Sequence, residues 1–146
     1  MRVLFRADAS AAIGSGHVAR CLTLAAVLRA SGKGIEAPLP WLADIDALEH
    51  CLAGEAEFDW IVVDHYGLDH RWQTAARRWA RRLAAIDDLN NRQHAVDLLF
   101  DQNFTAGDPE YAGRALGPCR QLLGPRYALI RGADLRQGFC RTDGRG

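Results

Sequence analysis

The sequence predicts an α/β protein with an open, mostly parallel sheet flanked by helices. Short, continuous apolar runs at residues 3–5 and 60–63 are typical of strands that are buried on both faces of a parallel sheet. Segments with helical spacing of apolar residues alternate with such runs, as in strand–helix–strand units. Polar residues directly follow several of the runs, which is where open α/β sheets bind ligands.

The composition indicates one ordinary globular domain. The chain has 146 residues, of which 49% are apolar and 25% charged. Eighteen basic residues balance eighteen acidic ones, so we expect neither a nucleic-acid partner nor association with a membrane. The four cysteines are far apart, and residues 1–2 lead directly into a strand without a signal-peptide pattern. These features predict a cytoplasmic protein with reduced thiols.

The first third of the chain predicts a strand, a glycine turn and a helix. Residues 2–6 form the strand, and residues 8–13 form a polar loop. From Gly16, apolar residues recur at helical spacing to about Ser31, and Gly32 suits a C-terminal cap. Residues 33–41 are a connection, where an alternating fold would have a second strand.

The remaining elements continue the alternation. Asp44 is expected to cap a short helix that ends near Gly54. A second helix is predicted over residues 69–82, with its arginines mostly on the solvent side. Strands are predicted at residues 60–63, 83–86, 98–100 and 120–124, and the polar, glycine-rich tail at 132–146 shows no packed element.

The glycine turn before the first long helix is the first candidate site. Gly14 and Gly16 let the backbone turn tightly, and the helix that follows offers free N–H groups and a positive dipole end to an anion. His17 stands at this helix start, where the dipole favours the neutral imidazole that a general base requires. The alternative is a tight turn with a histidine that faces water.

Other glycine-motif chemistries find no support. Residues 14–19 formally fit the dinucleotide pattern G-x-G-x-x-A, with Glu36 about twenty residues further on. We reject that interpretation because a polar loop separates the strand from Gly14 and because Glu36 follows no recognisable strand. The turn also lacks a Walker lysine, and the chain has no G-x-S-x-G elbow.

Four polar segments follow predicted strands and are expected on one rim of the sheet: residues 15–17, 64–66, 87–88 and 101–103. Asp64 and His65 fit either a ligand-binding pair or a turn that caps the next helix. Tyr66 offers a ring and a hydroxyl to a sugar, or it packs the loop as a half-buried tyrosine. The aspartates at 87–88 with His94 suggest a metal, but aspartates in loops are more typical of caps, so we assign no metal and no cofactor.

Six motifs occur in a fixed order along the chain. They are VLFRADAS (3–10), IGSGH (13–17) with Arg20, DHYGLD (64–69), DDL (87–89), DLLFDQN (97–103) and LGPRYALIR (123–131). The ordered set resembles the UDP-diacetamido-trideoxy-altropyranose hydrolases of pseudaminic acid biosynthesis. The resemblance covers roughly residues 1–131 with one gap.

The resemblance implies the Rossmann-like N-terminal half of a GT-B-type architecture, with the active site between two domains. It implies hydrolysis of a nucleotide-sugar substrate to UDP and free sugar without a metal or cofactor. His17 would be the base that activates water, and Tyr66 would line the sugar site. The substrate-binding residues expected in all are Gly14, Ser15, Gly16, Arg20, Asp64, His65 and Tyr66.

The chain departs from the family pattern in two places. After Gly32 it lacks a strand–helix unit of about thirty residues. After about Arg131 it leaves the pattern, so the UDP-binding C-terminal domain is expected to be missing, and an irregular tail at 132–146 follows the domain at 1–131. A fragment, an internal deletion and a truncated frame are all compatible with this pattern. The functional alternatives are the acceptor-binding domain of a GT-B glycosyltransferase and a non-catalytic remnant.

Overall fold

The structure is a computed structural model that describes residues 1–7, 16–28, 40–104 and 114–129. Within 16–28, the side chains at positions 17, 23 and 25–28 are not described. The polar loop at 8–13, nearly all of the connection at 33–41 and the tail at 132–146 therefore lie outside the described residues, as do Gly14 and Ser15.

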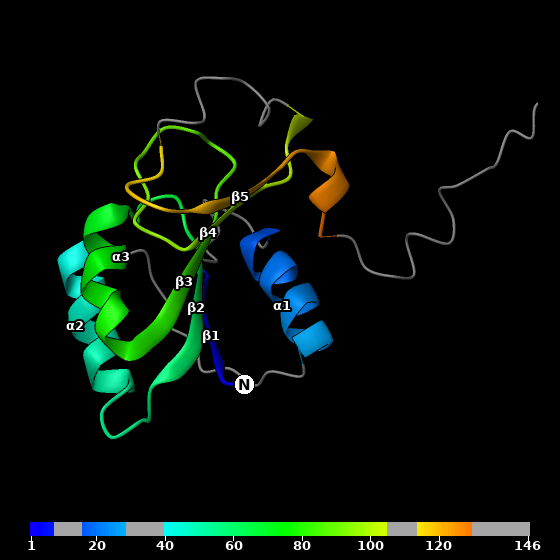
Figure 1. Ribbon diagram of the computed structural model, residues 1–146. Helices are drawn as coiled ribbons and strands as arrows, with labels where there is room; N and C mark the ends of the chain where they lie inside the picture. The colour runs from blue at the N-terminus through cyan, green and yellow to red at the C-terminus, as the bar shows by residue number, and fades with distance from the viewer. Residues whose placement is uncertain (8–15, 29–39, 105–113, 130–146) are drawn as a thin grey trace, which may run out of the picture.

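Five parallel strands form one sheet in the order in which they occur along the chain. They are β1 (Val3–Ala7), β2 (Phe58–Asp64), β3 (Ala80–Ile86), β4 (Leu98–Asp101) and β5 (Arg120–Leu123). Each strand pairs in parallel with the next. The open parallel sheet predicted from the apolar runs is thus confirmed, and its carboxyl ends meet at one edge (Figure 1).

Helices cover both faces of the sheet (Figure 1). On one face lie α2 (Trp41–Cys51) and α3 (His70–Ala76), and on the other lies α1 (Gly16–Leu28). Because side chains alternate along a strand, Ile61 joins the core under α2 and α3, whereas Val62 joins the core on the α1 side. None of the helices among the described residues has the length and apolar run needed to cross a membrane.

Asp44 does not cap α2, contrary to the prediction. The helix begins three residues earlier, at Trp41, and Pro40 is its N-terminal cap residue. Asp44 is fully buried, and its Oδ2 lies 3.0 Å from the Nε of Arg6 on β1. The indole Nε1 of Trp72 on α3 donates to its other oxygen at 2.9 Å. This carboxylate therefore joins α2 to β1 and α3 instead of satisfying the helix start.

The helix predicted over 69–82 is also wrong at its C-terminal end. Asp69 does cap the helix, since its side chain accepts a hydrogen bond from the N–H of Arg71, but α3 ends at Ala76. A short 3₁₀ turn, η1 (Arg77–Trp79), follows, and β3 already begins at Ala80. Pairing of Ala80 with Phe58 on β2 extends the strand backward, so sheet pairing overrides the helical spacing.

We predict that Asp44→Ala lowers the free energy of unfolding by about 3–5 kcal/mol, because it leaves the Arg6 guanidinium buried without its partner. Urea denaturation of the variant and the wild type measures the difference. Asp46→Ala is the matched control, since Asp46 lies on the same helix but is exposed, and it should change the free energy by no more than about 0.5 kcal/mol. Equal effects of the two substitutions would contradict the structural role of the pair.

Candidate site at the carboxyl ends of the strands

Arg20 joins two strand ends to the first helix. Its guanidinium donates to both oxygens of Asp64, with Nε 3.1 Å from Oδ2 and Nη2 2.9 Å from Oδ1. Its third nitrogen, Nη1, lies 3.0 Å from the Oδ2 of Asp88. Asp64 is the last residue of β2, and Asp88 follows β3 by two residues. One side chain of α1 therefore holds the carboxyl ends of β2 and β3 together.

Tyr66 completes this group. Its hydroxyl donates to the Oδ2 of Asp88 at 3.4 Å, and 38% of the residue is exposed. Burial raises the pKa of Tyr66, and the negative charge of Asp88 raises it further, so the hydroxyl keeps its proton. We call Arg20, Asp64, Tyr66 and Asp88 the rim cluster.

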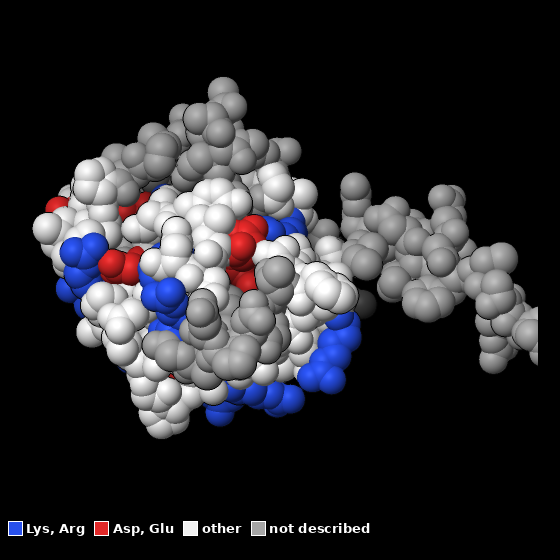
Figure 2. Space-filling view, turned by 90° about the horizontal axis from the view of Figure 1, so that it is seen from above, with Lys and Arg blue, Asp and Glu red and all other residues white. Residues whose placement is uncertain are grey.

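The rim cluster carries more negative than positive charge. Two carboxylates face one guanidinium, which leaves a formal charge of −1 when all three are ionised. Burial lowers the pKa of Arg20, but its hydrogen bonds and ion pairs with Asp64 and Asp88 outweigh that effect and raise it. Acidic and basic surfaces lie side by side where the molecule is seen from above (Figure 2). A negative cluster of this kind suits neutral hydroxyl and amide groups better than phosphates.

The residues that follow β4 also contact the rim cluster. The side-chain amide of Asn103, just after β4, donates to the main-chain carbonyl of Asp88 at 3.1 Å. The neighbouring Gln102 accepts the N–H of Leu129 with its Oε1 at 3.1 Å. Three of the four polar strand ends expected on one rim are therefore linked there. The side chains of the fourth, residues 15–17, lie outside the description.

The predicted residues of the glycine turn are described only in part. Gly16 is the first residue of α1 and is exposed, and a Cβ there would meet no described atom within 4 Å. His17 is the second residue of the helix, three positions before Arg20. Positions three apart share one side of a helix, so position 17 lies on the side of α1 that meets the rim cluster.

His65 points inward. The residue is only 4% exposed, and its Nδ1 accepts the N–H of Gly67 at 2.8 Å. A Cβ on Gly67 would lie 3.2 Å from the Cε1 of His65, so a side chain there would push the ring by a few tenths of an ångström. The ring thus shapes the turn that presents Tyr66, and its role as a substrate contact stays a prediction.

The sequence interpretation did not single out Asp88. Residues 87–88 are expected on the rim, with their aspartates interpreted as caps in place of metal ligands, and the structure separates the two, with Asp87 buried and Asp88 in the rim cluster. The alternation of side chains along β3 could have indicated the position of Asp88. Ile86 belongs to the core on the α1 side, so two residues further on Asp88 faces the same side as Arg20.

Asp87 is ionised inside the protein. Burial alone would raise its pKa, but the contact with His94 and the charge of Arg92 outweigh burial and lower the pKa to about 2. The Nη1 of Arg92 lies 2.9 Å from its Oδ1. No group of three or more histidine, cysteine or acidic side chains that could hold a metal ion occurs among the described residues.

The lowered pKa of Asp87 predicts a pH-dependent stability. A folded-state pKa of about 2, below the ordinary 3.8, contributes about 2 kcal/mol at neutral pH, and this contribution is lost as the pH falls from about 5 to about 2. The difference in free energy of unfolding between wild type and Asp87→Asn should therefore be largest above about pH 5 and shrink in acid. Denaturant titrations at several pH values measure it. A constant difference would contradict the assignment, and Asp46→Asn, at an exposed site, serves as the control.

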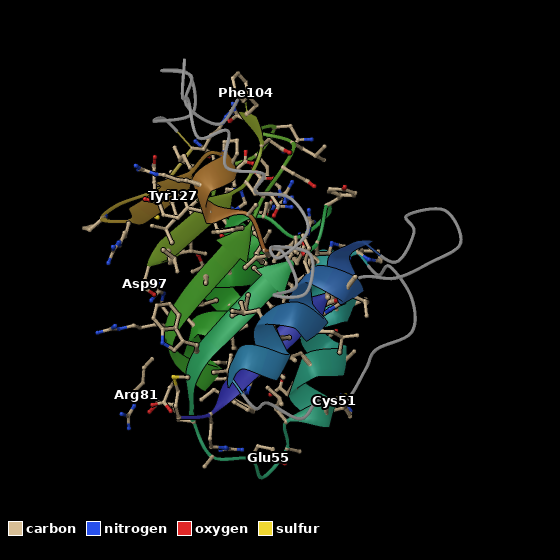
Figure 3. All side chains as sticks on the ribbon, turned by 90° about the vertical axis from the view of Figure 1, so that its right-hand side faces the viewer. Cys51, Glu55, Arg81, Asp97, Phe104 and Tyr127 are labelled. Atoms are coloured by element: carbon tan, nitrogen blue, oxygen red, sulfur yellow. The ribbon has the colours of Figure 1, made fainter. Side chains whose placement is uncertain are left out.

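The thiol of Cys21, beside the rim cluster, should be unreactive. Burial raises its pKa to about 12, and the negative charge of Asp64 adds to the effect. Cys51 is exposed and lies at the opposite end of the sheet (Figure 3). Because the thiolate is the reacting species, we predict that iodoacetamide labels Cys51 at least about tenfold faster than Cys21, as followed by peptide mass spectrometry. Similar rates at the two cysteines would contradict this prediction.

The chain is similar to a curated protein, although it matches no protein-family model. The chain is 33% identical over 145 residues to the UDP-2,4-diacetamido-2,4,6-trideoxy-beta-L-altropyranose hydrolase of Campylobacter jejuni, an alignment that covers 90% of this chain and 52% of the relative. The chain thus spans about half the length of the curated relative it matches. The motif-based resemblance to this family of UDP-sugar hydrolases is therefore confirmed for this chain, over about half the length of the whole enzyme.

Proposed function

We propose that the chain is the part of a UDP-sugar hydrolase that binds the sugar and supplies the base. The reaction is hydrolysis of a UDP-diacetamido-trideoxy-hexose to UDP and free sugar, as in pseudaminic acid biosynthesis. One observation carries the proposal: Arg20, from one motif of the ordered set, meets Asp64 and Tyr66, from a second motif, in one rim cluster. Their partner Asp88 belongs to a further motif of the same ordered set.

His17 is the general base of this proposal. It stands in the first turn of α1, where the helix dipole favours the uncharged imidazole. Arg20 fixes this turn of the helix against Asp64 and Asp88. His17 takes a proton from water, the water oxygen bonds to the anomeric carbon, and the bond from that carbon to the UDP oxygen breaks. UDP leaves with the electron pair of that bond.

The rim cluster is proposed to bind the sugar. Its excess negative charge disfavours a diphosphate, while carboxylate and hydroxyl oxygens accept hydrogen bonds from hydroxyl and acetamido groups. Tyr66 adds a half-exposed ring on which the sugar can pack. The remaining substrate-binding residues of this proposal are Gly14, Ser15, Gly16 and His65, of which Gly14 and Ser15 lie outside the described residues. The C-terminal domain that holds UDP in this proposal corresponds to the half of the relative that the chain does not span.

We predict that His17→Ala lowers the rate of UDP release from the diacetamido sugar nucleotide by about 10²–10⁴-fold, because the variant cannot take the proton from water. Chromatography of the released UDP measures the rate. His50→Ala is the matched control, since His50 is exposed near the end of α2 and its Nδ1 bonds only the carbonyl of Asp46, so its rate should equal that of the wild type. Equal rates for His17→Ala and the wild type would overturn the assignment of the base.

The same reaction mixture tests the two alternatives. A glycosyltransferase acceptor domain gives a glycosylated product when acceptors are present, whereas a hydrolase gives free sugar. A non-catalytic remnant gives neither product and, although folded, no heat in calorimetric titration with UDP or with the free sugar.

A further inference from the structure

A buried polar array lies directly behind the rim cluster. It consists of Gln73 on α3, His94 in the loop before β4, and Asp87 at the end of β3. Each of the three residues is at most 1% exposed. Buried polar groups are costly unless each is paired, so the direction of every hydrogen bond in the array matters.

The backbone fixes the orientation of Gln73. Its Oε1 accepts the N–H of Ala95 at 2.7 Å, so the amide nitrogen must be the end that faces His94. That nitrogen lies 3.0 Å from the Nδ1 of His94, and an amide NH₂ can only donate. Nδ1 therefore accepts, and the ring carries its proton on Nε2.

The protonated Nε2 lies near Asp87. It is 3.3 Å from the Oδ2 of Asp87 but outside hydrogen-bond geometry, so it makes a polar contact with the carboxylate. The donor–acceptor direction set by Gln73 therefore runs through His94 toward Asp87. The Oδ1 of Asp87 forms an ion pair with the Nη1 of Arg92 at 2.9 Å and accepts the N–H of Leu89 at 3.3 Å. Asp87 is thus held by Arg92 and Leu89 on one side and faces His94 on the other.

Two connections lead from the array to the rim cluster. Asp88 is the residue directly after Asp87, so the anchor of one sets the position of the other. Arg92, which holds Asp87 with Nη1, donates with Nη2 to the main-chain carbonyl of His65 at 3.0 Å. That carbonyl belongs to the peptide that leads into Tyr66. Asp88 and Tyr66, the two most exposed acceptors of the rim cluster, are therefore both connected to Asp87, Asp88 through the chain and Tyr66 through Arg92.

We propose that Gln73, His94 and Asp87 are positioning residues that set the places of Asp88 and Tyr66 through the tautomer of His94. The inference rests on the proposed function only in taking the rim cluster as the sugar site. A packing role alone would need the shape of these side chains, whereas this role needs the donor–acceptor direction along the array.

Nitrogen NMR of the full chain with isotope-labelled histidine tests the direction of the hydrogen bond between Gln73 and His94. We expect an unprotonated Nδ1 and a protonated Nε2 for His94 in the wild type. Gln73→Glu keeps the shape and the acceptor for Ala95, but a carboxylate cannot donate to Nδ1. In this variant Nδ1 should gain a proton, and the ring signals of Tyr66 should shift. Gln93→Glu, the same change at an exposed position next to His94, should alter neither signal.

A rescue experiment covers the case in which Gln73→Glu fails to fold. His94→Gln again offers one acceptor to Gln73 and one donor to Asp87, whereas His94→Leu fills a similar volume without either. We expect the Tyr66 signals to stay in their wild-type positions in His94→Gln and to shift in His94→Leu. If the wild-type Nδ1 carries the proton, or if His94→Leu and His94→Gln give the same Tyr66 signals, the proposal is overturned. These readouts need no turnover, so a chain that releases no UDP leaves the test of the array intact.

Discussion

The ion bridge made by Arg20 is the interaction on which the candidate site depends. Asp64 and Asp88 end neighbouring strands and would repel each other, but one guanidinium between them replaces that repulsion with two charge-assisted contacts. The side chain is mostly buried, so these contacts are screened less than those of a surface pair. Because Arg20 belongs to α1, the same bridge fixes the first turn of that helix, which carries position 17.

The sequence predicted the strands well because a parallel sheet buries both faces, so its strands are continuous apolar runs. It failed where a distant partner decides the outcome: Asp44 has the chemistry of a cap but pairs with Arg6, and pairing with β2 turns the end of a predicted helix into strand. The candidate site shows the same contrast between features that local sequence predicts and features that a distant partner decides. Motifs identified Arg20, Asp64 and Tyr66, whereas the different roles of Asp87 and Asp88, which follow β3, depend on their contacts. Asp87 faces Arg92 and His94, and Asp88 pairs with Arg20.

The connection from β1 to β2 contains helices on opposite faces of the sheet (Figure 1). Connections between parallel strands are right-handed, and α3 leads from β2 to β3 on the same face as α2. On the opposite face, the same handedness sends a connection through α1 away from β2, toward the far side of β1. Among the described strands, β1 has a neighbour on one side only. A right-handed connection through α1 would thus lead to the edge of β1 that has no neighbour among the described strands.

The contacts of α1 with the sheet are both apolar and polar. Among the described side chains of α1, Cys21 and Leu24 pack inward, while Leu22 is 63% exposed. A bidentate ion pair adds a directional contact, which resists rotation or sliding of a helix. The bidentate pair of Arg20 with Asp64 supplies that direction, and Asp88, held in place by Asp87 and Asn103, supplies a second point. The placement of position 17, where the proposed base stands, therefore depends in part on polar contacts at the strand ends.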